Sequence, residues 1–90
     1  MDFEFDPQKS ELNKTKHGID FEEAQAIWTD VASIQLNTNL GEEDRFLAIG
    51  LIGEALWTAV ITHRGNSIRI ISVRRSRKDE KKAYDNCRRI

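Results

Sequence analysis

Residues 67–75 read SIRIISVRR, and this stretch decides the fold. β-branched residues dominate it and an Arg-Gly-Asn turn signal precedes it, which predicts a β-strand. Strict alternation places Ile68 and Ile70 on one face of the strand and Ile71 and Val73 on the other. A strand with apolar residues on both faces is typical of the centre of a covered sheet, so we expect a central position.

The same stretch carries three arginines, Arg69, Arg74 and Arg75. Arginine side chains lie inside a sheet only where another group pairs with them. We therefore expect the strand to deliver its guanidinium groups to a rim or cleft, where they converge with the first helix. A planar guanidinium binds phosphate through two parallel hydrogen bonds, so such a cleft suits a phosphate-bearing ligand.

The charge of the chain is divided unevenly. Ten of the fourteen Lys and Arg residues, but three of the fifteen Asp and Glu residues, lie in residues 64–90. This segment therefore has a net charge of +7, and residues 1–63 have a net charge of −8. A basic segment of this kind favours a nucleic-acid partner. The alternative is that the two parts neutralise each other through intramolecular ion pairs.

Length and composition limit the class of protein. Ninety residues predict one domain, residues 1–90, with a modest core. The lone Cys87 cannot form an internal disulfide and fits a cytoplasmic location. Residues 1–4 are acidic where a signal peptide is basic, and the longest apolar stretch is too short for a membrane helix. His17, His63 and Cys87 lack the close spacing of a zinc site, so we expect no metal or cofactor.

Three helices are predicted. The first begins at Asp6-Pro7 and ends near His17, and the second begins at Asp20, with Glu23 completing a capping box, and ends near residues 29–30. The last is capped by Ser76, with Asp79 three residues later. Its apolar stripe is thin, which predicts that this helix docks weakly or is covered when a partner binds.

The remaining elements complete an α+β fold, a small antiparallel meander sheet of about four strands with two N-terminal helices and one C-terminal helix. Phe3 and Phe5 form either a short strand or a hydrophobic clamp. The expected strands are residues 31–36, 45–52, 55–63 and 67–75, and residues 37–44 form a polar loop.

One face of the first helix is polar, and it carries Lys9, Asn13, Lys16 and His17 at helical spacing. This stripe is either solvated or faces a ligand. His17 also fits a second role, because a cation near the end of a helix is favoured by the helix dipole. Both interpretations stay open at this point.

Cleavage of RNA without a metal needs a base for the 2′-OH proton, cations for the charged phosphorane and an acid for the departing 5′ oxygen. Arg69, Arg74 and Arg75 suit the second requirement. The candidates for proton transfer are His17, His63, Lys16, Lys81 and Tyr84. The alternative for Tyr84 is packing, and for His63 a structural or solvated position.

Taken together, these residues resemble the BrnT-type toxin family over most of the chain. The family more often has Ser-Ala-Arg at residues 72–74 and Ala at Ser76, so the departures are small. The residues that carry the resemblance are Phe5-Asp6, Lys9, Asn13, Lys16-His17-Gly18, Phe21-Glu22-Glu23-Ala24, Asp30, Glu43-Asp44-Arg45, Gly50, residues 69–75, Glu80 and Tyr84.

The resemblance implies a small RelE-like α/β ribonuclease toxin of a type II toxin–antitoxin system that inhibits translation. It also implies a BrnA-type antitoxin, which binds and inhibits the toxin and joins it in a dimer or larger complex. Operator DNA would be contacted only through the antitoxin. RelE-like toxins hold RNA on a basic concave sheet face.

The resulting hypothesis is a metal-independent endoribonuclease, and its alternative is a non-catalytic RNA- or protein-binding module of the same fold. Glu22 and Glu43 are expected to orient the cations. The expected catalytic residues are Arg69, Arg74, Arg75, Lys16, His17 and Tyr84, and the expected RNA-binding residues are Lys9, Arg45, Arg77 and Lys81.

Overall fold

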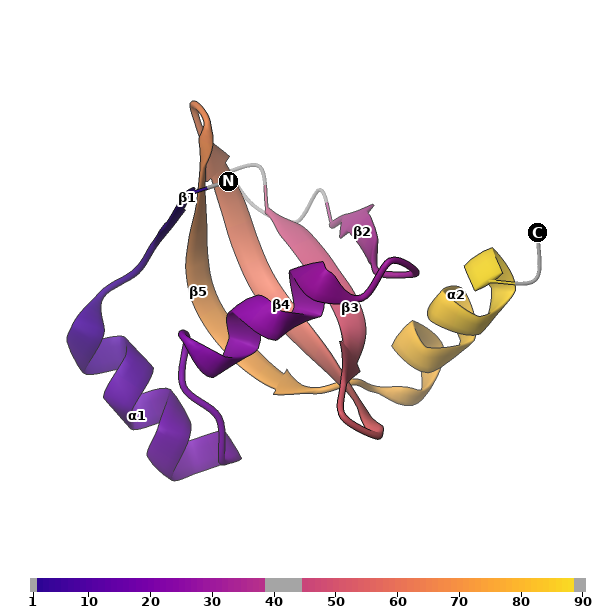
Figure 1. Cartoon of the computed structure of the whole chain (residues 1–90), viewed down its shortest axis with the longest axis horizontal. Coiled ribbons are helices and arrows are strands. Elements are labelled where there is room, and N and C mark those ends of the chain that lie inside the picture. Colours follow the sequence, from indigo (N-terminus) through magenta and orange to yellow (C-terminus); the bar gives the residue numbers. More distant parts are fainter. Residues whose placement is uncertain (1, 39–44, 89–90) are drawn as a thin grey trace.

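The computed structural model describes residues 2–38 and 45–88. In these parts of the chain five strands form one mixed sheet in the order β1-β5-β4-β3-β2 (Figure 1). The elements are β1 (Asp2–Glu4), α1 (Pro7–His17), the 3-10 helix η1 (Glu23–Thr29), β2 (Ile34–Asn37), β3 (Phe46–Ile52), β4 (Ala55–Arg64), β5 (Ser67–Arg75) and α2 (Lys78–Arg88).

The α+β class is confirmed, but the sheet differs in detail from the expected four-stranded RelE-like meander. Strands β2 to β5 do form an antiparallel meander. β1 adds a fifth strand, which pairs in parallel with the start of β5. Its Phe3 ring meets Trp28 edge-on with centroids 4.9 Å apart, so the N-terminal aromatic residues extend both the sheet and the core.

β5 departs from strict alternation at Ile71. Ile70 pairs with Ile61 and Ser72 pairs with Val60, so that Ile71 is an extra residue in β5. Such a β-bulge shifts every later side chain to the opposite face. The expectation that Val73 faces away from Ile70 was therefore wrong, and both are buried in the same core.

The core lies on one face of the sheet, which we call the core face. The chain from residue 19 to residue 29, including η1, covers it (Figure 1). η1 approaches closely at Gly50, where a β-carbon would lie 2.9 Å from the Ile27 carbonyl oxygen. The buried apolar cluster consists of Ile19, Phe21, Ala24, Ile27, Ala48, Ala59, Ile61, Ile68, Ile70 and Val73.

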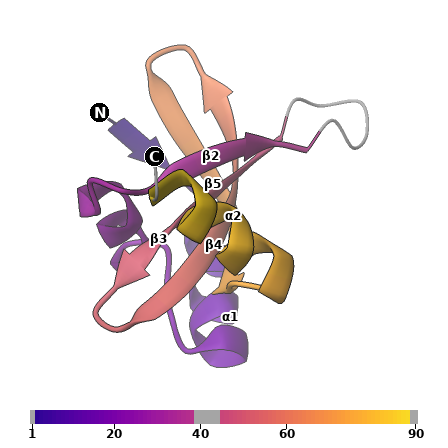
Figure 2. The same ribbon diagram turned by 90° about the vertical axis from the view of Figure 1, so that its right-hand side faces the viewer.

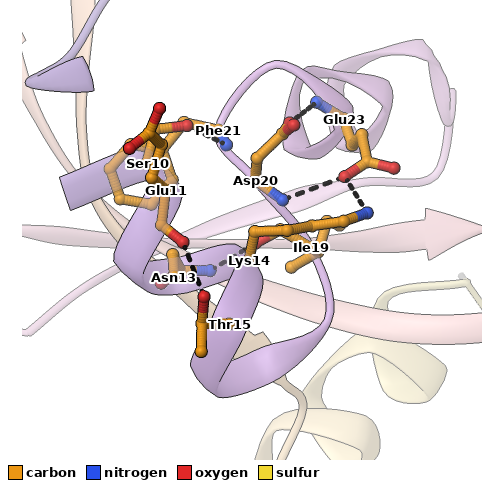
Figure 3. Close-up of polar contacts among 9 residues, drawn as sticks. All are labelled: Ser10, Glu11, Asn13, Lys14, Thr15, Ile19, Asp20, Phe21 and Glu23. Carbon is orange, nitrogen blue, oxygen red and sulfur yellow. Dashed lines mark hydrogen bonds and ion pairs between the residues drawn. The ribbon is translucent and has the colours of Figure 1, made fainter. Parts of the chain in front are cut away.

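Helix α1 is held by polar contacts rather than by an apolar stripe. Its N-cap is Asp6, which accepts the Gln8 amide proton, and its end is Gly18, with φ of +83°. The Ser10 hydroxyl accepts a hydrogen bond from the Phe21 amide, and the buried Asn13 donates to the Ile19 carbonyl (Figure 3). Asn13 therefore joins the helix to the chain that returns over the core face.

The predicted second helix is shorter than expected, because residues 20–22 form its cap and turn. Asp20 and Glu23 accept each other's backbone amide protons at 2.7 and 3.0 Å, which confirms the capping box (Figure 3). Lys14 of α1 donates to the same Glu23 carboxylate at 2.7 Å. This contact lowers the pKa of Glu23 and raises that of Lys14.

At each edge of the sheet, past the end of the outer strand, one polar side chain binds the backbone groups of the next strand. Beyond β1, the Asn13 amide donates to the Val73 carbonyl and accepts from the Val73 amide. Beyond β2, the Asp30 carboxylate accepts the Leu51 amide proton at 2.8 Å. These contacts satisfy backbone groups that an exposed edge leaves open.

Helix α2 packs on the face opposite the core face, at the far end of the molecule from α1 (Figures 1 and 2). Ile49 and Thr58 pair across β3 and β4 on that side, and both are fully buried. Within the described residues, no helix has the length and apolar character needed to span a membrane.

Candidate nucleic-acid interface

A row of guanidinium and hydroxyl groups lies on β4 and β5, on the side of the sheet opposite the core. Cross-strand pairing joins Thr62 to Arg69, Arg64 to Ser67, and Thr58 to Arg74. Directly opposed residues share a face, and Val73 and Ala59 occupy the core face. We call the set Thr62, Arg64, Ser67, Arg69, Ser72 and Arg74 the arginine face.

At one end of the arginine face, β1 brings a carboxylate next to two guanidinium groups. Glu4 Oε1 lies 3.7 Å from Arg69 Nη1 and 3.8 Å from Arg64 Nε. The Arg69 side chain is 35% exposed, so its guanidinium is held at the strand and still reaches solvent. These long, partly exposed contacts contribute little to stability and leave the cations available to a ligand.

At the other end, Arg74 forms a bidentate ion pair with Glu80 of α2. Arg74 Nη1 and Nη2 donate to the two carboxylate oxygens at 2.7 and 2.8 Å. The Thr58 hydroxyl and the Arg77 backbone amide also donate to Glu80, at 3.0 and 2.8 Å. Four donors therefore converge on a carboxylate that is 5% exposed.

These donors favour the ionised form of Glu80. The Arg74 guanidinium, followed by the Arg77 amide and the Thr58 hydroxyl, lowers the pKa of Glu80 to about 2 against the opposing effect of burial. The same pair raises the pKa of Arg74. Glu80 is therefore charged at neutral pH and accepts hydrogen bonds without donating one.

The cap of α2 differs from the predicted one. Glu80, three residues after Arg77, accepts the Arg77 amide proton, so Glu80 rather than Asp79 makes the capping contact. The Ser76 hydroxyl lies 2.8 Å from the Thr58 hydroxyl. Because Thr58 donates to the ionised Glu80, Ser76 donates to Thr58. Ser76 is thus used in the sheet contact and not as the helix cap.

One turn further along α2, Tyr84 anchors the helix to the end of η1. Its ring is 1% exposed, and its hydroxyl donates to Asp30 Oδ2 at 2.7 Å. The same oxygen accepts the Leu51 amide proton, and Asp30 Oδ1 accepts that of Ala32. This geometry favours packing and anchorage as the role of Tyr84.

The sequence of the chain matches a known protein family. Residues 5–80 match the family described as ribonuclease toxin, BrnT, of type II toxin–antitoxin system. The chain belongs to the BrnT family. It is therefore a ribonuclease toxin whose substrate is RNA and whose partner is an antitoxin. Comparison with curated proteins gave no match. The arginine face and Glu80 lie within the matched segment, whereas Glu4 and Tyr84 lie outside it.

In this BrnT chain, the third predicted arginine is separated from the other two. Arg75 pairs with Trp57, and Trp57 packs against the core cluster, so Arg75 lies on the core face. Its guanidinium carbon lies 5.4 Å from the centre of the Trp57 ring, as in a cation–π contact. The expected convergence of Arg69, Arg74 and Arg75 was therefore wrong, because adjacent residues of a strand point to opposite faces.

Helix α1 carries the next group of predicted residues along the edge of β5 (Figure 1). Lys9 and Lys16 are exposed, and His17 is half-buried. His17 follows Asn13 by one turn, so the two residues share one face of the helix, and Asn13 contacts β5 at Val73. The polar stripe thus divides, because Asn13 contacts the sheet and both lysines face solvent.

The other predicted residues lie outside the arginine face. Arg77 is exposed just before α2, Lys81 is exposed on α2, Arg45 is exposed before β3, and Glu22 is exposed before η1. Glu43 lies outside the described residues. His63 Nε2 lies 3.1 Å from Gln35 Oε1, and its ring meets Phe46 edge-on. This geometry gives His63 a structural contact.

The basic segment is only partly neutralised by the acidic one. Arg74 pairs with Glu80 of its own segment, whereas Arg64 and Arg69 approach Glu4. Four exposed cations, one just before α2 and three on it, make no ion pair with any residue that the structure describes, namely Arg77, Lys78, Lys81 and Lys82. The positive charge at this end of the chain remains available to an anionic partner.

Sequence reasoning missed the roles of Glu80, Thr58 and Asp30. The spacing of Arg77 and Glu80 is a signal that was available, because an acid three residues after a helix start fits a capping box. Thr58 and Asp30 gave no comparable signal, since their partners lie 22 and 54 residues away in the sequence.

Proposed function

We propose that this BrnT-family chain is a metal-independent endoribonuclease that binds the backbone of RNA along the arginine face. Its cleavage of RNA inhibits translation, and a BrnA-type antitoxin neutralises it. The observation that carries the proposal is the row of guanidinium and hydroxyl groups along β4 and β5. Guanidinium groups bind phosphate oxygens, and hydroxyl groups add uncharged donors to the same backbone.

The spacing of the row suits an extended strand of RNA. The bulge at Ile71 brings Arg69 and Arg74 onto one face. Their partners on β4, Thr62 and Thr58, are four residues apart, so the Cα atoms of the two arginines lie about 13 Å apart at ~3.3 Å per residue. The two arginines therefore contact different phosphates. Ser72 lies between them on the same face, and Thr62 lies opposite Arg69. Further exposed cations lie outside the row, namely Arg77 before α2, Lys81 on α2, Lys9 on α1 and Arg45 before β3.

The chemistry needs proton transfer as well as cations. The 2′ oxygen attacks phosphorus, the bond from phosphorus to the 5′ oxygen breaks, and one proton leaves the 2′-OH while another joins the 5′ oxygen. Arg74 stabilises the negative charge of the phosphorane, and Arg69 holds a neighbouring phosphate of the same strand. We assign proton transfer to His17, because imidazole both accepts and donates protons and this residue shares a helix face with Asn13, which contacts β5. Lys16, one residue earlier, assists by attracting the phosphate.

The test is cleavage of a fluorescent single-stranded RNA by the purified chain in excess EDTA. We expect cleavage to continue, and His17→Gln to lower kcat about 100-fold while RNA affinity stays within about twofold. A strict metal requirement would remove the metal-independent mechanism. Binding without any cleavage would instead support the non-catalytic module.

The antitoxin and translation parts of the proposal have their own readout. Adding the toxin to a cell-free translation reaction should stop protein synthesis, and prior addition of a BrnA-type antitoxin should restore it. Inhibition that persists with the antitoxin present would contradict the assignment of that partner.

A further inference from the structure

The Arg74–Glu80 pair uses only part of the guanidinium. Arginine has five N–H donors in one plane. Glu80 takes one donor from each terminal nitrogen, in an end-on arrangement. A second donor of Nη1 points to the Arg75 carbonyl oxygen at 3.4 Å. Three of the five donors of Arg74 therefore have partners in the protein.

The two remaining donors form a second fork. They are Nε–H and the other proton of Nη2, which lie side by side along one edge of the plane. Neither has a partner among the residues that the structure describes. Every buried side-chain nitrogen or oxygen of the described residues has a hydrogen-bond partner, so the unpaired Nε of Arg74 reaches solvent.

Glu80 is itself fixed from two directions. Thr58 holds it from the sheet, and the Arg77 amide holds it from the start of α2. With Glu80 immobile, the plane of the Arg74 guanidinium is set by two short hydrogen bonds rather than by the flexible arginine chain. The cost in side-chain entropy of ordering an arginine is then met before any ligand binds.

We propose that Glu80 is a positioning residue that orients Arg74 so that its Nε–H and free Nη2–H form a fork for two oxygens of an RNA phosphodiester. The inference rests on the proposed function, since it concerns a phosphate contact on the arginine face. Glu80 then has two opposing effects on the cleavage of RNA. Glu80 lowers the positive charge of the surface, and yet it promotes the reaction by holding Arg74 in place.

Glu80→Gln separates the two effects. Glutamine keeps the size of the side chain and can still accept from Thr58 and the Arg77 amide, but its NH₂ group repels the second donor of Arg74. We expect kcat to fall about tenfold or more, while RNA affinity stays the same or tightens because a negative charge is lost. A purely electrostatic role predicts tighter binding with no loss of kcat.

Asp79→Asn is the matched control. Asp79 is the exposed neighbour of Glu80 on α2, and its charge acts on Arg74 through space without a hydrogen bond. The substitution removes the same charge one residue away. We expect kcat within about twofold of the wild type and an affinity change like that of Glu80→Gln. An equal loss of kcat in both variants would overturn the proposal.

Arg74→Lys tests the same fork independently, also if Glu80→Gln does not fold. Lysine keeps the charge and can pair with Glu80, but it has no fork. We expect at least a tenfold loss of kcat with affinity within about threefold, provided that circular dichroism shows an intact fold. Full activity of Arg74→Lys would contradict the fork.

A readout that does not need cleavage separates this inference from the proposed function. An all-deoxy oligonucleotide lacks the 2′-OH and cannot be cleaved, and its titration should shift the ¹H–¹⁵N signal of Arg74 Nε in the wild type. The shift should be lost in Glu80→Gln. If the wild type cleaves no RNA but this pattern holds, the nuclease proposal fails and the positioning proposal stands. A signal that is unmoved in the wild type would overturn the positioning proposal.

Discussion

Arg74 and Arg75 are consecutive in the sequence, but the structure gives them opposite surroundings. Arg74 lies on the arginine face, 21% exposed, and its guanidinium is fixed by Glu80. Arg75 lies on the core face, exposed above the Trp57 ring. Two cations that look like one cluster in the sequence therefore belong to different surfaces, and only one of them shares a face with Arg69.

The bulge in β5 decides which arginines meet. Arg69 and Arg74 are five residues apart, so strict alternation would place them on opposite faces and would group Arg69 with Arg75. The extra residue Ile71 reverses this grouping. The arrangement of charges in this chain therefore depends on one irregular backbone position.

The largest expected effect is on cleavage. Arg69→Ala should lower kcat/KM about 100-fold, because it removes a cation that holds the RNA by a phosphate next to the reacting one. Arg75→Ala removes the same charge from the other face and should change kcat/KM less than about threefold. The measurement is the rate of RNA cleavage at fixed ionic strength. Equal losses in both variants would break the distinction between the faces.

The next largest effect is on stability, through the hydrogen bonds that hold the backbone of β5 just after the bulge. Asn13→Ala removes three buried hydrogen bonds, two of them to Val73, directly after the shift in register. The free energy of unfolding in urea should fall by about 2–3 kcal/mol. Leu12→Ala, whose side chain is 69% exposed on the same helix, should change it by less than about 0.5 kcal/mol.

Acid should weaken the contact that fixes Arg74. Because Glu80 has its pKa lowered to about 2 in the folded state, its contribution to stability is present above its ordinary pKa of 4.5 and is lost as the pH falls toward 2. The loss should be on the order of 2 kcal/mol. Urea unfolding of the wild type and Glu80→Gln, measured between pH 6 and 2.5, should converge in this window. Parallel curves would show that Glu80 is not paired in this way.

The smallest effect concerns the far end of α2. Tyr84→Phe removes the hydrogen bond to Asp30 and should cost about 1 kcal/mol, with faster hydrogen exchange confined to α2. The arginine face should keep its protection. Faster exchange throughout β4 and β5 would show that α2 and the arginine face open as one unit.

Local signals in the sequence predicted much of the fold. The cap at Asp6, the stop at Gly18 and the Asp20–Glu23 capping box depend on neighbouring residues, and the structure confirms all three. The meander of β2 to β5 also follows from short connections and turn residues. These elements could be predicted because each depends on residues close together in the chain.

Contacts between distant residues could not be predicted in the same way. The pairing of β1 with β5 joins residues 2–4 to residues 67–69, and no local pattern marks it. The sequence does not indicate the bulge at Ile71, because an isoleucine fits either face of a strand. The charge split predicted a basic surface, but which arginine lies on which face depends on that one residue.

Mapping where RNA binds on the protein tests the role of the arginine face directly. The chain, labelled with ¹⁵N, can be titrated with an uncleavable all-deoxy strand while backbone amide and arginine Nε signals are followed. We expect shifts to concentrate at Thr62, Arg69, Ser72 and Arg74, with Arg75 and Trp57 little affected. Shifts centred on Arg75 and Trp57, with the arginine face unmoved, would contradict it.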